Sequence, residues 1–356
     1  MLQDIDELDQ FRIMVQHLES CRNLILDGGE ARCRAALILL DHVSEVILYR
    51  IINEEYDRDD VYRKVIPEKY PPKRRSDIRR SFRSKLEVVT ETHKLPVSVP
   101  TTLDVLHTYR NATYHRDKHN PAVLPVLARI ALVATADLFA RTGGGFENRG
   151  VGGSSDSLEW LERYGLGGDS PIWFETIAIE IARQLKLGVR PKLPTVTNSF
   201  VADISTRLVA IRDLLAELFP NGKSEDIDRT LKWYEFRRTH PELESTLSKT
   251  FRQLTYKIAS GHGDEVTREE YEAAEIDFRT AYDQRFADFK PTCRYRDLVG
   301  IERQSESLRN EKNFRGALAG YARLDKQLTS FEQSTNRAFI EMEWAAEAQA
   351  DIARGK

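Results

Sequence analysis

Residues 107–121, HTYRNATYHRDKHNP, bring together side chains that can move a proton and side chains that can hold a phosphate. Three of the chain's eight histidines lie in this window, together with Arg110 and Asn111. A histidine titrates near neutral pH, and an arginine presents N–H donors in a fixed fork that suits phosphate oxygens. With the amide of Asn111, Arg110 and His115 suit attack of an RNA 2′-hydroxyl on the neighbouring phosphate. This chemistry needs no cofactor and no metal, and the sequence shows no obvious metal site.

The spacing of Arg110 and His115 makes a demand on the local backbone. Five residues along a continuous helix separate two positions by about 140° around the axis. The two side chains therefore converge on one pocket only if the helix loosens between residues 111 and 113, where Asn and Thr are poor helix formers. The sequence predicts this loosening, because the chain must in any case turn before Pro121.

Two carboxylates on a preceding predicted helix are candidates to position the motif. Asp41 and Glu45 are four residues apart, and a polar group on an apolar helix needs a partner. They are expected to hold Arg110 or His115, although arginines on their own helix are equally suitable partners.

Three further residues of the window have open roles. Tyr114 either packs or stacks on a base, and His119 is either a turn residue or a second proton carrier. His107 contributes only if its helix face points towards the pocket.

A basic segment, KRRSDIRRSFRSK, precedes the motif and is a candidate RNA-binding surface. It carries seven cations against one acid in a chain of net charge -3. Such a run suits an RNA backbone, although an ordinary solvated face has the same pattern. The candidate phosphate contacts are Lys73, Arg74, Arg75, Arg79, Arg80, Arg83 and Lys85.

Composition indicates a soluble, cytoplasmic protein of two or three domains. The chain has 356 residues, and no apolar run approaches the roughly 20 residues of a membrane span. Three cysteines, Cys21, Cys33 and Cys293, cannot all pair and favour a reducing compartment. The acidic start MLQDIDELDQ is not typical of a signal peptide.

Apolar residues recur at spacings of three and four almost throughout, which predicts an all-α fold. An N-terminal four- or five-helix bundle is expected over 1–142, with helices that include 4–26, 30–55, a segment from after Pro100 towards Arg110, and 121–141. The last of these is apolar on all sides, so it needs cover from the rest of the bundle or from a second subunit. We expect a second subunit to supply part of this cover.

The rest of the chain is expected to form a separate helical region. Six glycines between 143 and 153 predict a linker or loop over 143–156. Helical patterns over 157–356, in one or two parts divided near residue 195, include a long C-terminal helix with an apolar seam from Tyr321 to Ala345. The four tryptophans are expected in the core: Trp160, Trp173, Trp233 and Trp344.

Residues 1–142 resemble a HEPN domain (higher eukaryotes and prokaryotes nucleotide-binding). The resemblance is carried by the motif Arg110-Asn111-x3-His115 and by its position before the last helix of the bundle. That family has an R-x(4–6)-H motif, usually with Asn, Asp or His after the arginine. The resemblance implies a metal-independent endoribonuclease of a toxin–antitoxin or antiviral system, with a site formed where two protomers meet. It implies that Arg110 and His115 are catalytic and that Asn111 supports them. The resemblance does not extend to residues 157–356.

Three functions are compatible with these patterns. The first is an endoribonuclease whose C-terminal helices bind an inhibiting or activating protein. The second is a non-catalytic adaptor that dimerises through the bundle and binds a partner through the C-terminal helices. The third is a module that uses the motif to bind RNA or a nucleotide without turnover. An intact Arg-Asn-x3-His motif favours the first.

Overall fold

The computed structural model describes residues 2–63, 65–116, 122–146, 150–151, 155–166, 172–220, 222–240, 280, 283–291 and 294–354. The expected all-α class is confirmed. Within these ranges the strand content is one short antiparallel pairing of β1 (Gly150–Val151) with β2 (Ile172–Trp173).

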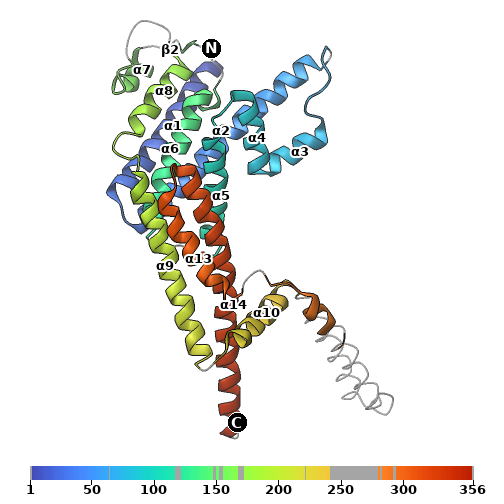
Figure 1. Ribbon diagram of the computed structural model, residues 1–356. Coiled ribbons are helices and arrows are strands. Elements are labelled where there is room, and N and C mark those ends of the chain that lie inside the picture. The colour runs from blue at the N-terminus through green and yellow to red at the C-terminus, as the bar shows by residue number, and fades with distance from the viewer. Residues whose placement is uncertain are drawn as a thin grey trace. The chain divides into compact units, whose positions relative to one another are not determined.

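Helices form nearly all of the remaining regular structure (Figure 1). They are α1 (Leu2–Asp27), α2 (Glu30–Tyr62), α3 (Pro72–Arg80), α4 (Phe82–His93), α5 (Ser98–Arg116), α6 (Leu124–Thr142), α7 (Ser155–Glu162), α8 (Phe174–Leu185), α9 (Leu193–Leu218), α10 (Ser224–Thr239), α13 (Asp297–Ser307) and α14 (Phe314–Ala353), with 3-10 turns η1 (Gly143–Gly145) and η4 (Leu308–Asn310).

The apolar helix α6 lies at the centre of the first compact unit, which comprises residues 1–203 and 308–322. It contacts α1, α2, α5 and α8, and 13 of its 19 residues are buried. The helices of the same chain therefore bury most of this helix, for which we expected a second subunit to supply part of the cover. An apolar pattern on all sides requires cover, and here the helices of the same chain supply it.

The glycines after α6 form a tight turn, so the expected boundary over 143–156 is not where the chain divides. Gly143, Gly144 and Gly145 are buried and all have positive φ. A Cβ on Gly144 would lie 2.8 Å from the Phe139 ring. The turn contacts α8, which packs on α6 within the same unit.

Helix α5 begins at Ser98, two residues before Pro100. Proline is compatible with the first turn because the backbone N–H groups there have no partner within the helix. The helix then continues to Arg116, beyond the expected end near Arg110. Helix α2 also extends past its expected end at residue 55, and its last turns reach outward beside α3 and α4 (Figure 1).

The second unit comprises residues 204–307 and 323–356. Arg207 of α9 joins α14 through Asp325, at 2.6 Å, and through Glu332, at 2.7 Å. The C-terminal seam is confirmed where it is described, because Leu324, Leu328, Phe331, Thr335 and Ala338 are buried.

Two of the four tryptophans do not lie in a core. Trp344 is 66% exposed and Trp173 is 47% exposed, whereas Trp160 and Trp233 are half-buried. Trp173 lies in β2 and not on a helix, and Trp344 lies on α14, where a helical pattern predicts burial only if another element covers that face.

The cysteines Cys21 and Cys33 are buried free thiols, and Cys293 lies outside the described residues. Burial raises the pKa of Cys21 to about 12. Among the described helices, none combines the length and apolar character needed to cross a membrane.

Candidate active site

Four polar side chains form a closed ring where α5 faces α2. Asp41 Oδ1 lies 2.9 Å from His107 Nδ1, and Asp41 Oδ2 lies 2.7 Å from Arg110 Nη2. Arg110 Nη1 donates to Asn111 Oδ1 at 2.8 Å, and Asn111 Nδ2 lies 3.1 Å from His107 Nε2. The ring therefore joins Asp41 of α2 to three residues of α5 that lie on one helical face at spacings of three and four.

The ring selects one protonation state of His107. The carboxylate of Asp41 accepts, so Nδ1 of His107 is the donor. Asn111 must turn its oxygen towards Arg110, which presents only donors, and its NH2 group therefore points at His107 Nε2. Nε2 must then accept, so the contacts fit a neutral imidazole with its proton on Nδ1.

The surroundings of the ring are largely apolar. The side chains of Asp41, His107 and Arg110 are 7%, 19% and 20% exposed. The ring of Phe82 stacks on His107 with centroids 4.0 Å apart and planes 4° apart. An ion pair in such surroundings is weakly screened by solvent, which strengthens its electrostatic attraction.

The guanidinium of Arg110 is fixed at two points. The hydrogen bond to Asn111 uses one of its five N–H donors, and the contact with Asp41 is an ion pair without hydrogen-bond geometry. Its Nε atom is buried and has no hydrogen-bond partner among the described residues. Asp41 offsets part of the cost of burying this cation.

The backbone around the motif does not loosen as expected. Residues 111–116 continue α5 without a break. Intrinsic propensity is a weak influence, and packing of α5 against α2, α4 and α6 overrides it. Arg110 and His115 thus occupy positions about 140° apart around one helix axis. The side chains of Tyr114 and His115, and all of His119, lie outside the described residues.

Glu45 does not join the ring. Its Oε1 atom lies 3.7 Å from Nζ of Lys85, which is buried at 8% exposure. Lys85 is thereby removed from the candidate phosphate contacts, because its ammonium group lies inside the fold beside a carboxylate.

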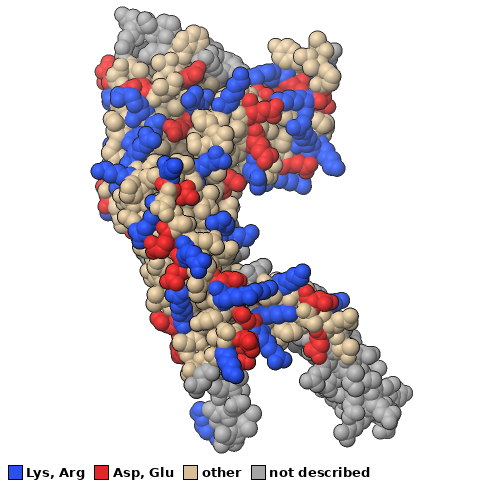
Figure 2. Space-filling model, in the orientation of Figure 1, with Lys and Arg blue, Asp and Glu red and all other residues tan. Residues whose placement is uncertain are grey.

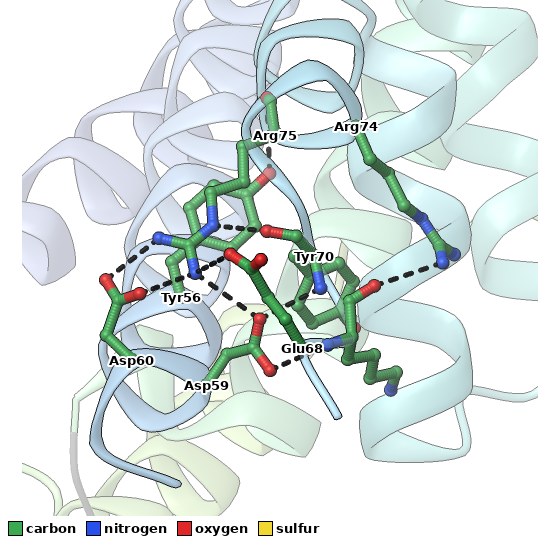
Figure 3. A network of polar contacts seen from close by, with 8 residues as sticks. Tyr56, Asp59, Asp60, Glu68, Tyr70, Arg74 and Arg75 are labelled. Atoms are coloured by element: carbon green, nitrogen blue, oxygen red, sulfur yellow. Dashed lines mark hydrogen bonds and ion pairs between the residues drawn. The ribbon is translucent and has the colours of Figure 1, made fainter. Parts of the chain in front are cut away.

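Arg75 makes internal contacts and is therefore not available to bind a phosphate (Figure 3). Its two Nη atoms donate to Asp60 at 2.9 and 2.8 Å, and Nη2 also contacts Asp59 at 3.3 Å. Its Nε donates to the carbonyl of Tyr70, and Glu68 lies 3.5 Å away. Arg75 therefore ties α3 to the end of α2, and its charge is matched by three carboxylates.

The titration of these carboxylates reflects their partners. The backbone N–H of Lys69 is the main cause that lowers the pKa of Asp59. The hydrogen bonds from Arg75 lower the pKa of Asp60. Both carboxylates are therefore ionised at neutral pH, as the contacts to Arg75 require.

The other five cations of the segment are exposed: Lys73, Arg74, Arg79, Arg80 and Arg83. Arg74 donates to the carbonyl of Lys69, and Arg83 pairs with Glu87 at 3.3 Å. Figure 2 shows cationic and acidic side chains interspersed over this part of the molecule. The exposed surface is therefore less basic than the count of charges in the segment indicates.

His107 has a larger part in the site than the sequence predicts. His107, Arg110 and Asn111 have the spacing i, i+3, i+4, which places them on one face of a helix. This spacing was a usable signal, but the pairing with Asp41, 66 residues away in the chain, appears only in the fold. Among the described residues, no group of three or more His, Cys, Asp or Glu side chains is placed to hold a metal ion.

No family model, curated protein or solved structure matches this chain. The ring and the R-x4-H motif are therefore the observations on which a functional proposal rests.

Proposed function

We propose that this protein is a metal-independent endoribonuclease. The observation that carries the proposal is the ring that fixes Arg110 between Asp41 and Asn111, five residues before His115. A guanidinium held in advance stabilises developing charge without reorganising during the reaction. The resemblance of residues 1–142 to HEPN domains leads to the same activity.

The proposed reaction forms a bond between the 2′-oxygen and phosphorus and breaks the bond from phosphorus to the 5′-oxygen. One proton leaves the 2′-hydroxyl and one is delivered to the departing 5′-oxygen, so His115 carries protons without net consumption. Arg110 contacts the phosphate oxygens through N–H groups that Asp41 and Asn111 do not use. Asn111 and Asp41 are positioning residues in this proposal, and His107 completes the ring.

A complete site requires a second copy of the chain. On the continuous helix α5, Arg110 and His115 are separated by about 140°, so one copy does not direct both towards one phosphate. A two-fold dimer that joins the C-terminal ends of two α5 helices would place Arg110 of one protomer beside His115 of the other. This dimer face differs from α6, which is buried within its own chain.

The product of cleavage tests the proposed function. Incubation of the purified protein with RNA in the presence of a chelator should yield fragments that end in a 2′,3′-cyclic phosphate. A substrate with a 2′-deoxy sugar at the cleaved position should resist, because it lacks the attacking group. Mass spectrometry of the fragments checks both points. Products with 3′-hydroxyl ends, or cleavage that depends on added magnesium, would exclude this mechanism.

The exposed cations of α3 are proposed to bind the RNA backbone. Lys73 and Arg80 are exposed and make no hydrogen bond or ion pair within the described residues, so they are the best candidates. Replacing both with glutamine should reduce the slope of log K against log salt by about 1.4, since each single-strand phosphate contact contributes about 0.7.

Fluorescence anisotropy with labelled single-stranded RNA measures this slope. The matched control replaces Arg303 and Lys326 of the second unit, which are exposed and carry the same total charge. An equal change in both variants would show that net charge alone matters and that α3 has no specific part in binding.

A second function, that of a helical adaptor, is favoured by one observation on α14. Ile340 and Trp344 are one helical turn apart and are 45% and 66% exposed. Exposed aromatic and aliphatic residues at this spacing suit docking of a protein partner. In the proposed nuclease, the same face binds an inhibiting or activating protein, as a toxin or an antiviral effector requires. RNA that stays intact in the product assay would leave the adaptor function as the better account.

A further inference from the structure

A cavity of about 400 Å³ opens in the first unit, where the N-terminal ends of α5 and α14 meet α6. Its apolar lining includes Ile130, Val133 and Ala134 of α6. Phe314, the first residue of α14, adds an aromatic ring. The volume falls within the range typical of small-molecule sites, and the apolar lining suits a carbon-rich ligand body.

The charged groups of the cavity favour an anion. Arg190 and Arg315 line it, are exposed, and make no hydrogen bond or ion pair within the described residues. The acid of the lining, Asp137, is already paired with Nζ of Lys186 at 2.6 Å. The uncompensated charge of the cavity is therefore that of two guanidinium groups.

Neutral donors lie in the same lining. Thr102 is 8% exposed, and its hydroxyl has no hydrogen-bond partner among the described residues. A threonine hydroxyl that lines a cavity and makes no internal hydrogen bond is available to a ligand. The side-chain oxygen of Asn313 caps α14 by accepting from the backbone N–H of Gly316. The NH2 group of Asn313 is therefore left as a donor.

We propose that this cavity binds a small organic anion whose apolar body contacts α6 and whose anionic group meets Arg190 and Arg315. The hydroxyl of Thr102 and the N-terminal ends of the two helices add donors to the same anionic group. Along α5, Thr102 lies about 12 Å from Arg110, so the cavity is separate from the polar ring and independent of the proposed nuclease activity.

A matched pair of fluorescent probes tests the proposal with the full-length protein. The probe 1-anilinonaphthalene-8-sulfonate has an apolar body and a sulfonate, and N-phenyl-1-naphthylamine has the same body without the charge. The sulfonate probe should bind with a stoichiometry of one per chain, roughly 10-fold more tightly than the neutral probe. Inorganic phosphate alone should compete weakly, because it cannot use the apolar lining.

Variants of the lining locate the site. Arg190→Gln with Arg315→Gln should weaken the sulfonate probe roughly 10-fold or more and leave the neutral probe unchanged. Val133→Phe should exclude both probes, because Val133 lines the cavity and is half-buried, so the larger ring can fill the cavity without displacing the packed interior. Arg32→Gln removes an exposed arginine outside the cavity and should change neither affinity.

Two outcomes would overturn the proposal. Equal affinity for the charged and neutral probes would mean that the arginines do not recognise an anion. Unchanged sulfonate binding in Val133→Phe, with a wild-type circular dichroism spectrum and unfolding temperature, would place the bound probe elsewhere.

Discussion

Replacing His115 with alanine is expected to lower the rate of RNA cleavage by roughly 10²–10⁴-fold, the usual contribution of a positioned proton carrier. Arg110→Lys is expected to lose roughly 10²–10³-fold, because a single ammonium cannot contact Asp41 and Asn111 at once and still reach the phosphate. Initial rates on a short labelled RNA measure both effects. His42, which is exposed on α2, provides the matched control, and His42→Ala should cleave at the wild-type rate.

Mixing two inactive variants tests whether the site is shared between protomers. A mixed dimer of Arg110→Ala and His115→Ala chains contains one site with both residues and one site with neither. At equal amounts, half of the dimers are mixed, so about a quarter of the wild-type activity should return. No recovery after verified exchange of subunits would show that each chain builds its own site, and activity of His115→Ala at the wild-type level would remove the mechanism altogether.

Replacing Asp41 with alanine is expected to cause the largest loss of stability. The change leaves the buried guanidinium of Arg110 without its counterion and the Nδ1–H of His107 without its acceptor. Removal of one partner of a buried pair costs about 3–5 kcal/mol, and the 20% exposure of Arg110 puts our expectation at about 3 kcal/mol. Scanning calorimetry should show the first unit unfolding roughly 6–12 °C lower than in wild type. Asp57→Ala, an exposed acid on the same helix, should stay within about 0.5 kcal/mol.

A double replacement separates the structural role of the ring from its chemical role. Asp41→Leu with Arg110→Met exchanges the ion pair for apolar side chains of similar size, which often restores or raises stability. This variant should recover most of the unfolding temperature lost in Asp41→Ala and remain inactive on RNA. An unfolding temperature of Asp41→Ala equal to that of wild type would mean that the ring does not form in solution.

The composition of the candidate site was accessible from sequence, whereas its connections were not. The side-chain chemistry of Arg110, Asn111 and Asp41 suits a phosphate and its support, and the fold places all three in one ring. Glu45 has the same side-chain chemistry as Asp41 but faces Lys85 instead. The two carboxylates differ by about one turn on α2, and the packing of α4 and α5 against that helix decides which cation each one meets.

The basic segment shows that the sequence does not reveal which charged side chains become paired in the fold. A count along the chain treats its seven cations alike, because it carries no information on the neighbours that folding brings to each. Asp59 and Asp60 lie at the end of α2. Arg75 reaches both carboxylates only because α3 folds back beside that end of α2. Long-range contacts of this kind convert a solvated cation into a structural one.

The helical class, the positions of most helices and the requirement that α6 be covered followed from residue periodicity, because the pitch of a helix relates neighbouring residues directly to its faces. Periodicity defines an apolar face but does not identify the element that packs on it. The fold covers α6 with α1, α2, α5 and α8 of the same chain. It also turns Gly143–Gly145 into a buried connection within the first unit and joins His107 to Asp41. These outcomes depend on packing and hydrogen bonds between residues distant in sequence, and local patterns do not encode which distant partners meet.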